Sequence, residues 1–452
     1  MKKYILVLII FSYISGSVYA QNMQIPTALK DYIAIAMKQN PQIQASEARW
    51  RNSDAQVAEA ASYLYPKIDF SARLTTYDGG RVIDIPGVGS VNTAGLGVVP
   101  YDTKFEATWP IGNYAVWQGV STAQSFRDAS TAQVAATERD ISLQVSQAYF
   151  NYAKASALIE VRKNQLKLAE ENLKLTKALF SADKVAKNDV LRAEVSVANA
   201  EGDIVTTRRY QIVAQTAFNT MLMRKADAPI ELLNAEETQR LTTFINDIVD
   251  DPTKRDQRMA LPDLKSDLEK AYNERPEIKQ LLATEQGLEG TKRINSADFF
   301  PDISLYASYG WIEENLNLSS SSDLLVGALV FKWNLFSGFG TKAKVDQAQA
   351  QIEEIQYQRQ ALTNGIQVEL ESARSEKISA IQRLALNKKI LASAEENYRI
   401  TKLQYDNGTA QLISLLDAQF TLGNSNTNYT DAVYDLLIAE MKYKRALGND
   451  LK

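Results

Sequence analysis

The chain has 452 residues, 45% of them hydrophobic, and is therefore long enough to bury a substantial core. It contains no cysteine and no histidine, which excludes disulfide bonds, thiol chemistry, the usual zinc sites and every histidine-based catalytic triad. Its 50 basic and 54 acidic residues give a net charge of −4, without the excess of positive charge typical of nucleic-acid binding. We therefore expect a folded protein with no nucleic-acid partner, no metal and no cofactor.

Residues 1–20 have the pattern of a secretory signal peptide. Lys2 and Lys3 precede the apolar run 4–11, and small residues lead to a cleavage site after Ala20. A retained membrane anchor is the weaker alternative, because the apolar run is too short to span a bilayer. Without this segment 48 basic and 54 acidic residues remain, a net charge of −6. No later segment approaches 18 consecutive apolar residues, so the exported chain is either soluble or crosses a membrane as a closed β-barrel.

The rest of the chain contains an internal duplication. Two pairs of segments lie 235 residues apart: NPQIQ (40–44) with RPEIK (275–279), and YPKIDF (65–70) with FPDISL (300–305). A third pair lies 225 residues apart: FSADKVAKNDVLRAE (180–194) with YDNGTAQLISLLDAQ (405–419). The change of spacing places an insertion of about ten residues in the first half, between Pro66 and Trp109.

Each half is predicted to follow the same plan, and the order of the segments defines the domains. Two helices meet at an X-Pro junction, at Pro41 and again at Pro276, because the residue before proline disfavours a continuing helix. Two strands, a very long helix, a tight tip and a second long helix follow. We expect four parts in chain order: the signal peptide 1–20, a first structural repeat 21–228, a linker or equatorial segment 229–272, and a second structural repeat 273–452.

Four segments have strand character, and three of them alternate between apolar and polar residues. They are expected at about 66–78, 101–111, 301–312 and 323–335, the last being more uniformly apolar. The polar face fits either the outside of a soluble sheet or the lumen of a barrel. Aromatic residues near the strand ends suit membrane interfaces but are also ordinary β formers: Tyr77, Tyr101, Trp109, Trp311 and Trp333. Four strands are too few to close a spanning barrel, so a membrane-spanning role requires several chains to share one barrel.

Two proline-free stretches predict helices far longer than those of ordinary globular domains. Residues 115–180 and 341–405 would each extend about 100 Å as a straight helix. Apolar residues in the second stretch recur at helical and heptad spacing, which predicts a coiled coil or long bundle. The predicted seam consists of Val345, Ala348, Ile352, Ile355, Leu362, Ile366, Leu384, Leu391, Tyr398 and Tyr405. The tips of the two hairpins are expected near 181–188 and 406–410.

Taken together, these motifs resemble the outer membrane efflux family, the TolC-like exit ducts, over nearly the whole mature chain. Besides the duplicated segments above, WPIGNYAVWQG (109–119) and WNLFSGFG (333–340) each close a strand pair. The resemblance implies a mainly α fold with a β-barrel portion, in which each protomer gives four strands to one trimeric transmembrane β-barrel. The helices would continue the barrel as a long periplasmic coiled-coil tunnel. A passive duct of this kind would open at its helical tips to a periplasmic adaptor (membrane fusion) protein and an inner-membrane transporter.

The resemblance also assigns roles to residues at the two tips. Asp189 would be a gate acid, contacted by the aromatic ring of Tyr405, and Asp417 an acid forming a ring in the trimer. Asn188 and Ser414 would belong to the same constriction. The turns would provide adaptor docking: Asp183, Lys184, Val185, Gly408, Thr409 and Ala410. Three carboxylates around an axis repel one another and attract cations, so such a ring would form a cation-selective constriction.

Three positions depart from the family pattern, and simpler explanations of the gate residues stay open. Ala410 stands where relatives carry a gate arginine, Ser414 where they carry a second ring acid, and Asp183 where glycine is usual. The gate would then be held more weakly and cation block would be softer. Asp189 is also explained as an acid favouring a helix N-terminus, and Asp417 as a solvated residue. Tyr405 lies on the heptad seam and fits a packing role equally well.

A channel in the outer membrane is therefore the leading prediction. The alternative from another class is a periplasmic coiled-coil adaptor without a pore, although adaptors normally lack a duplicated strand pair. An enzyme would need a carboxylate pair or Ser-Lys chemistry, and no spacing in the chain singles one out. The exported substrate is not predictable from the chain, because a passive duct takes its substrate from its transporter.

Overall fold

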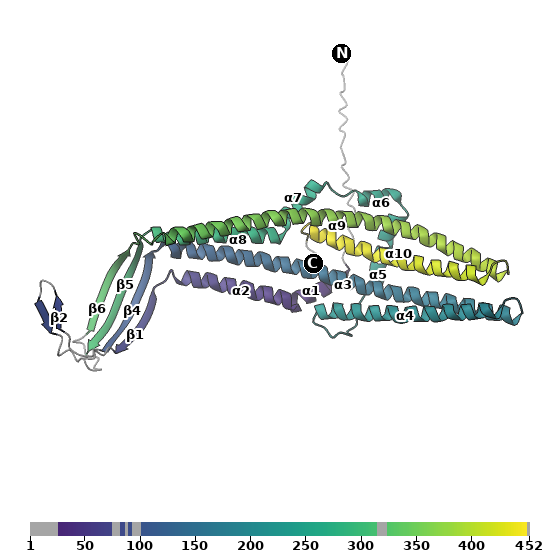
Figure 1. The fold of residues 1–452 in the computed structure, drawn as a ribbon, viewed down its shortest axis with the longest axis horizontal. Coiled ribbons are helices and arrows are strands. Elements are labelled where there is room, and N and C mark those ends of the chain that lie inside the picture. The colour runs from purple at the N-terminus through teal and green to yellow at the C-terminus, as the bar shows by residue number, and fades with distance from the viewer. Residues whose placement is uncertain (1–25, 75–81, 86–88, 93–100, 314–322, 450–452) are drawn as a thin grey trace, which may run out of the picture. The chain divides into compact units, whose positions relative to one another are not determined.

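The computed structural model describes residues 26–74, 82–85, 89–92, 101–313 and 323–449. The predicted signal peptide lies outside these residues. The described residues form two compact units: unit 1 consists of residues 26–40, 141–267 and 369–449, and unit 2 of the described residues within 41–140 and 268–368. Two long helices contribute to both units, α3 (Tyr114–Ser181, 68 residues) and α9 (Gly340–Asp406, 67 residues), and both match the predicted proline-free stretches (Figure 1).

Unit 2 contains a four-stranded antiparallel sheet with the strand order β1-β4-β5-β6 (Figure 1). Its strands are β1 (Lys67–Leu74), β4 (Tyr101–Gly112), β5 (Asp302–Glu313) and β6 (Asp323–Lys332). They lie within two residues of the predicted positions, except that Tyr77 and the predicted end of the first strand fall outside the described residues and β6 ends before Trp333.

One face of this sheet is apolar across all four strands. The register aligns Phe70, Phe105, Tyr309 and Leu325 in one row, and Ile68, Ala107, Ala307 and Gly327 in the next. The rings of Phe70 and Phe105 lie 5.0 Å apart. These side chains are not covered within the protomer, since Ile68 is 71% and Leu325 75% exposed. A large exposed apolar face indicates contact with lipid or another chain.

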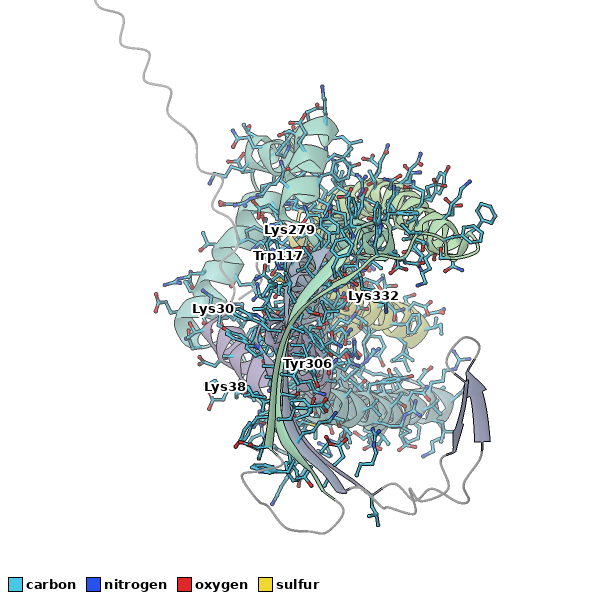
Figure 2. The ribbon with its side chains drawn as sticks, turned by 90° about the vertical axis from the view of Figure 1, so that its left-hand side faces the viewer. Lys30, Lys38, Trp117, Lys279, Tyr306 and Lys332 are labelled. Carbon is cyan, nitrogen blue, oxygen red and sulfur yellow. The ribbon has the colours of Figure 1, made fainter. Side chains whose placement is uncertain are left out.

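The opposite face of the same sheet is polar on β1, β4 and β5. Glu106 accepts a hydrogen bond from the hydroxyl of Tyr306 at 2.6 Å and pairs with the ammonium of Lys104 at 3.0 Å. Gly310 faces Lys104, and a Cβ at this glycine would lie 2.4 Å from the lysine Cβ, so the approach requires glycine. Figure 2 labels Tyr306 on β5 and Lys332, the last residue of β6.

The described residues between β1 and β4 contain further regular structure that the sequence analysis did not predict. The structure places a second, two-stranded antiparallel sheet here, formed by β2 (Val82–Ile85) and β3 (Gly89–Asn92). The sequence signal for this hairpin is the short β-branched segment VIDI (82–85), followed by a proline and two glycines.

The helices of unit 2 follow the predicted X-Pro junctions. Helix α2 spans Pro41–Ser62 and α8 spans Pro276–Asn295, followed by the 3₁₀ turn η1 (Ser296–Phe299). Asn40 and Arg275, the residues before the two prolines, both have extended backbone angles. The indoles of Trp109 and Trp333 donate to the carbonyls of Leu64 and Phe299, which lie just before the first strand of each strand pair.

Unit 1 is almost entirely helical. Its helices are α1 (Thr27–Gln39), the second half of α3, α4 (Lys187–Met221), α5 (Ala235–Val249), α6 (Pro252–Met259), the second half of α9 and α10 (Leu412–Ala446). Helix α7 (Leu264–Glu274) begins in unit 1 and ends in unit 2. The predicted α9 seam is largely buried, including Leu384, Leu391, Tyr398 and Tyr405, whereas Val345, Ile355 and Leu362 are partly exposed.

Two apolar clusters hold unit 1 together at some distance from the tips. An aromatic cluster joins α1, α3 and α4: the ring of Phe218 meets Tyr32 edge-on at 5.0 Å and Tyr149 at 5.9 Å. In the predicted equatorial segment, Ile245 and Ile248 of α5 pack against α9 and α10. Among the residues that the structure describes, no helix is apolar over a stretch long enough to cross a membrane.

Candidate functional site

The candidate site lies at the two tips of unit 1, where α3 turns into α4 and α9 turns into α10 (Figure 1). The two turns have the same geometry. In the first, the amide of Lys184 donates to the carbonyl of Leu179 and the amide of Asp183 donates to Phe180. In the second, Thr409 donates to Gln404 and Gly408 donates to Tyr405. Both patterns are Schellman motifs, which satisfy the last carbonyls of a helix and reverse the chain.

The residue at the centre of each turn has a left-handed backbone. Gly408 has a φ of 73°, a conformation that glycine adopts without strain. Asp183 has a φ of 56°, so the aspartate takes the left-handed conformation at the position where the resemblance implies a glycine. Aspartate tolerates this conformation better than most residues because its short side chain bonds locally. The two tips thus share one fold but differ in chemistry at the reversal.

Below the tips, a buried apolar cluster joins all four helices. Its members include Ala193 of α4, Leu391 and Tyr405 of α9, and Leu412 and Leu415 of α10, with Leu179 of α3 packed against them. Ala410 also packs against this cluster, at the position where the resemblance implies a gate arginine. Apolar contacts therefore join the hairpins at this position within the protomer.

A line of buried polar side chains runs through the same cluster. Asn172 of α3 donates to Gln419 of α10 at 2.7 Å and to the hydroxyl of Tyr398 at 3.3 Å. One turn nearer the tip, the hydroxyls of Thr176 and Tyr405 share a hydrogen bond of 3.1 Å. Asn172 and Thr176 are 1% and 0% exposed, so each hydrogen bond here is made without competition from water.

Tyr405 has a different partner within the protomer from the one that the resemblance implies. Its hydroxyl pairs with Thr176, whereas Asp189 acts on it only through charge. The pKa of Tyr405 is raised overall, mainly by burial. The charge of Asp189 adds to this increase, and the Thr176 hydrogen bond opposes it. Both the packing role and a gate role are consistent with this position, and the gate role stays a prediction.

The other predicted site residues lie at the surface of the tips. Asp189 is half-buried in the first turn of α4, where its carboxylate also favours the helix dipole, and Asn188 beside it is exposed. Ser414 and Asp417 are exposed on the first two turns of α10. Lys184 and Thr409 are exposed, and Val185 is half-buried. A ring of Asp417 carboxylates requires further copies of the chain and stays a prediction.

Removing the Tyr405 hydroxyl is expected to reduce the pH dependence of stability in alkali. The raised pKa of Tyr405 means that its stabilisation is fully present below pH 10.0, the ordinary value, and is lost as the pH rises through the folded-state value. Tyr405→Phe should cost about 1 kcal/mol near neutral pH through the lost Thr176 hydrogen bond. The free energy of unfolding of this variant should also fall less steeply as the pH rises, which urea titrations at several pH values would measure. Tyr210→Phe, at an exposed α4 tyrosine, is the control and should change neither quantity.

Asn172, Thr176 and Gln419 are the site residues that sequence reasoning missed. The repeat gave no signal of burial. AEENLKLTK (169–177) in α3 recurs as AEENYRITK (394–402) in α9, but Asn172 is buried whereas its counterpart Asn397 is exposed. Among the described residues, no group of three or more acidic side chains is arranged to hold a metal ion.

The fold and tips define an internally duplicated helical hairpin protein with a four-stranded sheet, and comparisons with known proteins identify its family. The sequence profile described as Outer membrane efflux protein matches residues 32–222 and 268–449. The chain therefore belongs to the outer membrane efflux protein family. This membership confirms the predicted class of protein, its location in the outer membrane and its role in efflux. The family is one of transport channels and not of enzymes.

Individual relatives agree with this assignment. The chain is 20% identical to outer membrane protein TolC of Vibrio cholerae over 96% of its own length and 92% of that protein. It is 22% identical to TolC of Escherichia coli over 90% and 80%. The solved outer membrane protein VceC of Vibrio cholerae is similar in fold, with a TM-score of 0.76, 16% identity and coverage of 94% of this chain and 97% of VceC. The MtrE outer membrane channel of Neisseria gonorrhoeae gives a TM-score of 0.75, 19% identity and coverage of 94% and 90%.

Proposed function

We propose that three copies of this chain form one passive duct through the outer membrane, each giving β1, β4, β5 and β6 to a shared barrel. The observation that carries this proposal is the open sheet of unit 2. Its apolar face is exposed on every strand, and its edge strands β1 and β6 each pair on one side only within the described sheet. Unpaired strand edges are not tolerated in lipid, so each edge requires the edge of another copy.

The duct acts with two partners, an adaptor protein in the periplasm and a transporter in the inner membrane. Its own residues supply no energy, since the family consists of channels and the chain lacks the glycine-rich loops that bind nucleotide phosphates. The two tips are the parts that the adaptor contacts, because their turns carry exposed, chemically distinct side chains on a rigid helical support. Substrate choice belongs to the transporter.

A periplasmic adaptor without a pore is the competing function, and the family match argues against it. The two functions separate in one experiment, in which the purified full chain is added to a planar bilayer. A duct gives stepwise conductance, whereas an adaptor gives none even when it binds the membrane surface. Absence of conductance from protein extracted from the outer membrane would reject the duct.

Conductance measurements test the gate role of Asp189 and Tyr405. Asp189→Ala is expected to loosen the closed tip and raise the single-channel conductance, because the resemblance places this carboxylate at a contact between neighbouring hairpins. Tyr405→Phe should act in the same direction through a looser contact with Thr176. Asp203→Ala, farther along α4 from the tip, is the control. Unchanged conductance in both tip variants would reject their gate role.

The second tip is expected to bind divalent cations. In a trimer, three Asp417 carboxylates would lie around one axis, and such a ring attracts cations into the pore. Asp417→Ala should therefore weaken block of the conductance by a divalent cation such as Mg²⁺. Glu395→Ala, at an exposed acid of α9 away from the tip, is the control and should leave the block unchanged. Full block in Asp417→Ala would place the cation site elsewhere.

A further inference from the structure

Strand β6 differs from the other three strands of the four-stranded sheet because it is apolar on both faces. Alternate residues of β6 lie on the polar face of the sheet, where their β5 partners include Ser304, Tyr306 and Ser308: Leu324, Val326, Ala328 and Val330. Leu324 is 53% and Val330 42% exposed, and Ala328 is also exposed. We call these four β6 residues the β6 stripe.

Most of the rest of this face is polar, and its charges balance. The charged residues on it are Lys67, Asp69, Arg73, Asp102, Lys104, Glu106, Asp302 and Lys332. Of these residues of the described strands, four are basic and four are acidic, so the face does not favour ions of one sign. The β6 stripe is where the face departs from the ordinary alternation of a membrane strand, because polar residues are expected there.

The charged side chains near the stripe already have partners on the same face. Lys104 pairs with Glu106 at 3.0 Å. Glu106 also accepts hydrogen bonds from the hydroxyls of Tyr306 at 2.6 Å and Ser71 at 3.4 Å. The apolar side chains of the stripe have no such compensation, because contact with water is unfavourable for them. A ligand therefore gains most on this face by covering the stripe with an apolar group.

We propose that the β6 stripe binds the apolar part of amphiphilic molecules that pass through the duct. This inference rests on the proposed function, in which the shared barrel turns the polar face of the sheet toward the lumen. Beside each stripe lie Tyr306 of the same copy and strand β1 of the next copy, whose Lys67 and Asp69 provide charges of both signs. An amphiphile with a positive, negative or zwitterionic head group thus meets an opposite charge next to an apolar surface.

Molecules in transit are the occupants that this location favours. Lipid contacts the opposite face of the sheet, and neighbouring copies meet at the edges of β1 and β6. From Leu324 to Val330 the stripe extends about 20 Å, at about 3.3 Å per residue, which is long enough for an alkyl chain or a fused-ring system. Such contacts are weak and spread along the strand, so a ligand can both enter and leave.

Single cysteines test the inference, because the chain has none of its own. Ala328→Cys places a thiol in the stripe, whereas Gly327→Cys places one beside it on the lipid side, where a Cβ meets open space. In full-length protein reconstituted into lipid nanodiscs, a water-soluble sulfonated maleimide should label Ala328→Cys faster than Gly327→Cys. Octylphosphocholine, added below its critical micelle concentration, should slow the labelling of Ala328→Cys. Phosphocholine alone should not, because it lacks the apolar chain.

Two further variants separate the stripe from the rest of the lumen. Thr108→Cys lies in the same cross-strand row as Ala328, two strands away on β4, and should be labelled without protection by octylphosphocholine. Val326→Thr/Val330→Thr, made in the Ala328→Cys background, keeps the shape of both side chains but replaces a methyl group with a hydroxyl in each. It should raise the concentration of octylphosphocholine for half-protection about tenfold, because each buried apolar carbon contributes to binding. Its labelling rate without octylphosphocholine should be unchanged.

The conductance of each variant in a planar bilayer separates failure of this inference from failure of the duct. In protein that conducts, labelling of Ala328→Cys that octylphosphocholine does not slow, or equal protection of Thr108→Cys, would overturn the inference and leave the duct intact. Conducting protein in which the maleimide does not reach Ala328→Cys would also overturn it, since protein then covers the stripe. Protein that does not conduct and is labelled faster at Gly327→Cys would overturn the shared barrel itself.

Discussion

Replacing Asp267 with alanine is expected to lower the free energy of unfolding by about 3–5 kcal/mol, because it leaves a buried charge without its partner. Asp267 is 4% exposed, pairs with the guanidinium of Arg374 and accepts a hydrogen bond from the hydroxyl of Tyr443 at 2.8 Å. Asp267 thus connects the start of α7 to both α9 and α10. Arg374 also approaches Glu371 at 3.8 Å, which offsets part of the loss and favours the lower end of the range.

Urea unfolding of the purified protein measures this effect, and two variants control it. Asp256→Ala removes an exposed carboxylate of α6 and should change stability by less than about 0.5 kcal/mol. Tyr443→Phe removes one hydrogen bond but keeps the ion pair, so it should cost about 1 kcal/mol. A loss in Asp267→Ala no larger than that in Tyr443→Phe would show that the ion pair contributes nothing at this position.

Replacing Asn172 with leucine is expected to have the second largest effect, on both stability and channel gating. The substitution leaves the buried Gln419 amide and the Tyr398 hydroxyl without this partner, at about 1–3 kcal/mol for each unsatisfied group. Because the network joins α3 to α9 and α10 close to the tips, its loss should also increase the time that the channel spends open.

The double variant Asn172→Leu/Gln419→Leu distinguishes an unsatisfied partner from simple loss of packing. Removing both members of a buried hydrogen bond is often nearly neutral, so the double variant should be more stable than Asn172→Leu alone. The coupling between the two substitutions follows from a double-mutant cycle of unfolding free energies. Additive losses would show that Asn172 acts through packing alone.

The sequence was sufficient to predict the main elements of the fold because their signals are long or repeated. Proline-free stretches predicted the bounds of α3 and α9 to within one residue, and the X-Pro junctions predicted the first residues of α2 and α8. Period-two alternation located β1, β4 and β5. The β2-β3 hairpin was missed because its strands have only four residues each, too short for a reliable periodic signal.

The tip turns were predictable, whereas their side-chain partners were not. Gly408 and the repeated spacing were enough to place both reversals. Pairing in space was not predictable, because Tyr405 lies within reach of several polar residues and only the packing of α3 on α9 selects Thr176. The buried state of Asn172 was hidden for a related reason, since an asparagine in a long amphipathic helix is more often solvated than buried.

The central claim of this account is that three copies of the chain share one duct, and the mass of the intact particle tests it most directly. Native mass spectrometry of the full chain, extracted in mild detergent from purified outer membranes, should show a particle of three protomers. A monomer under conditions that preserve other outer membrane trimers would contradict the claim, because four strands cannot close a spanning barrel on their own.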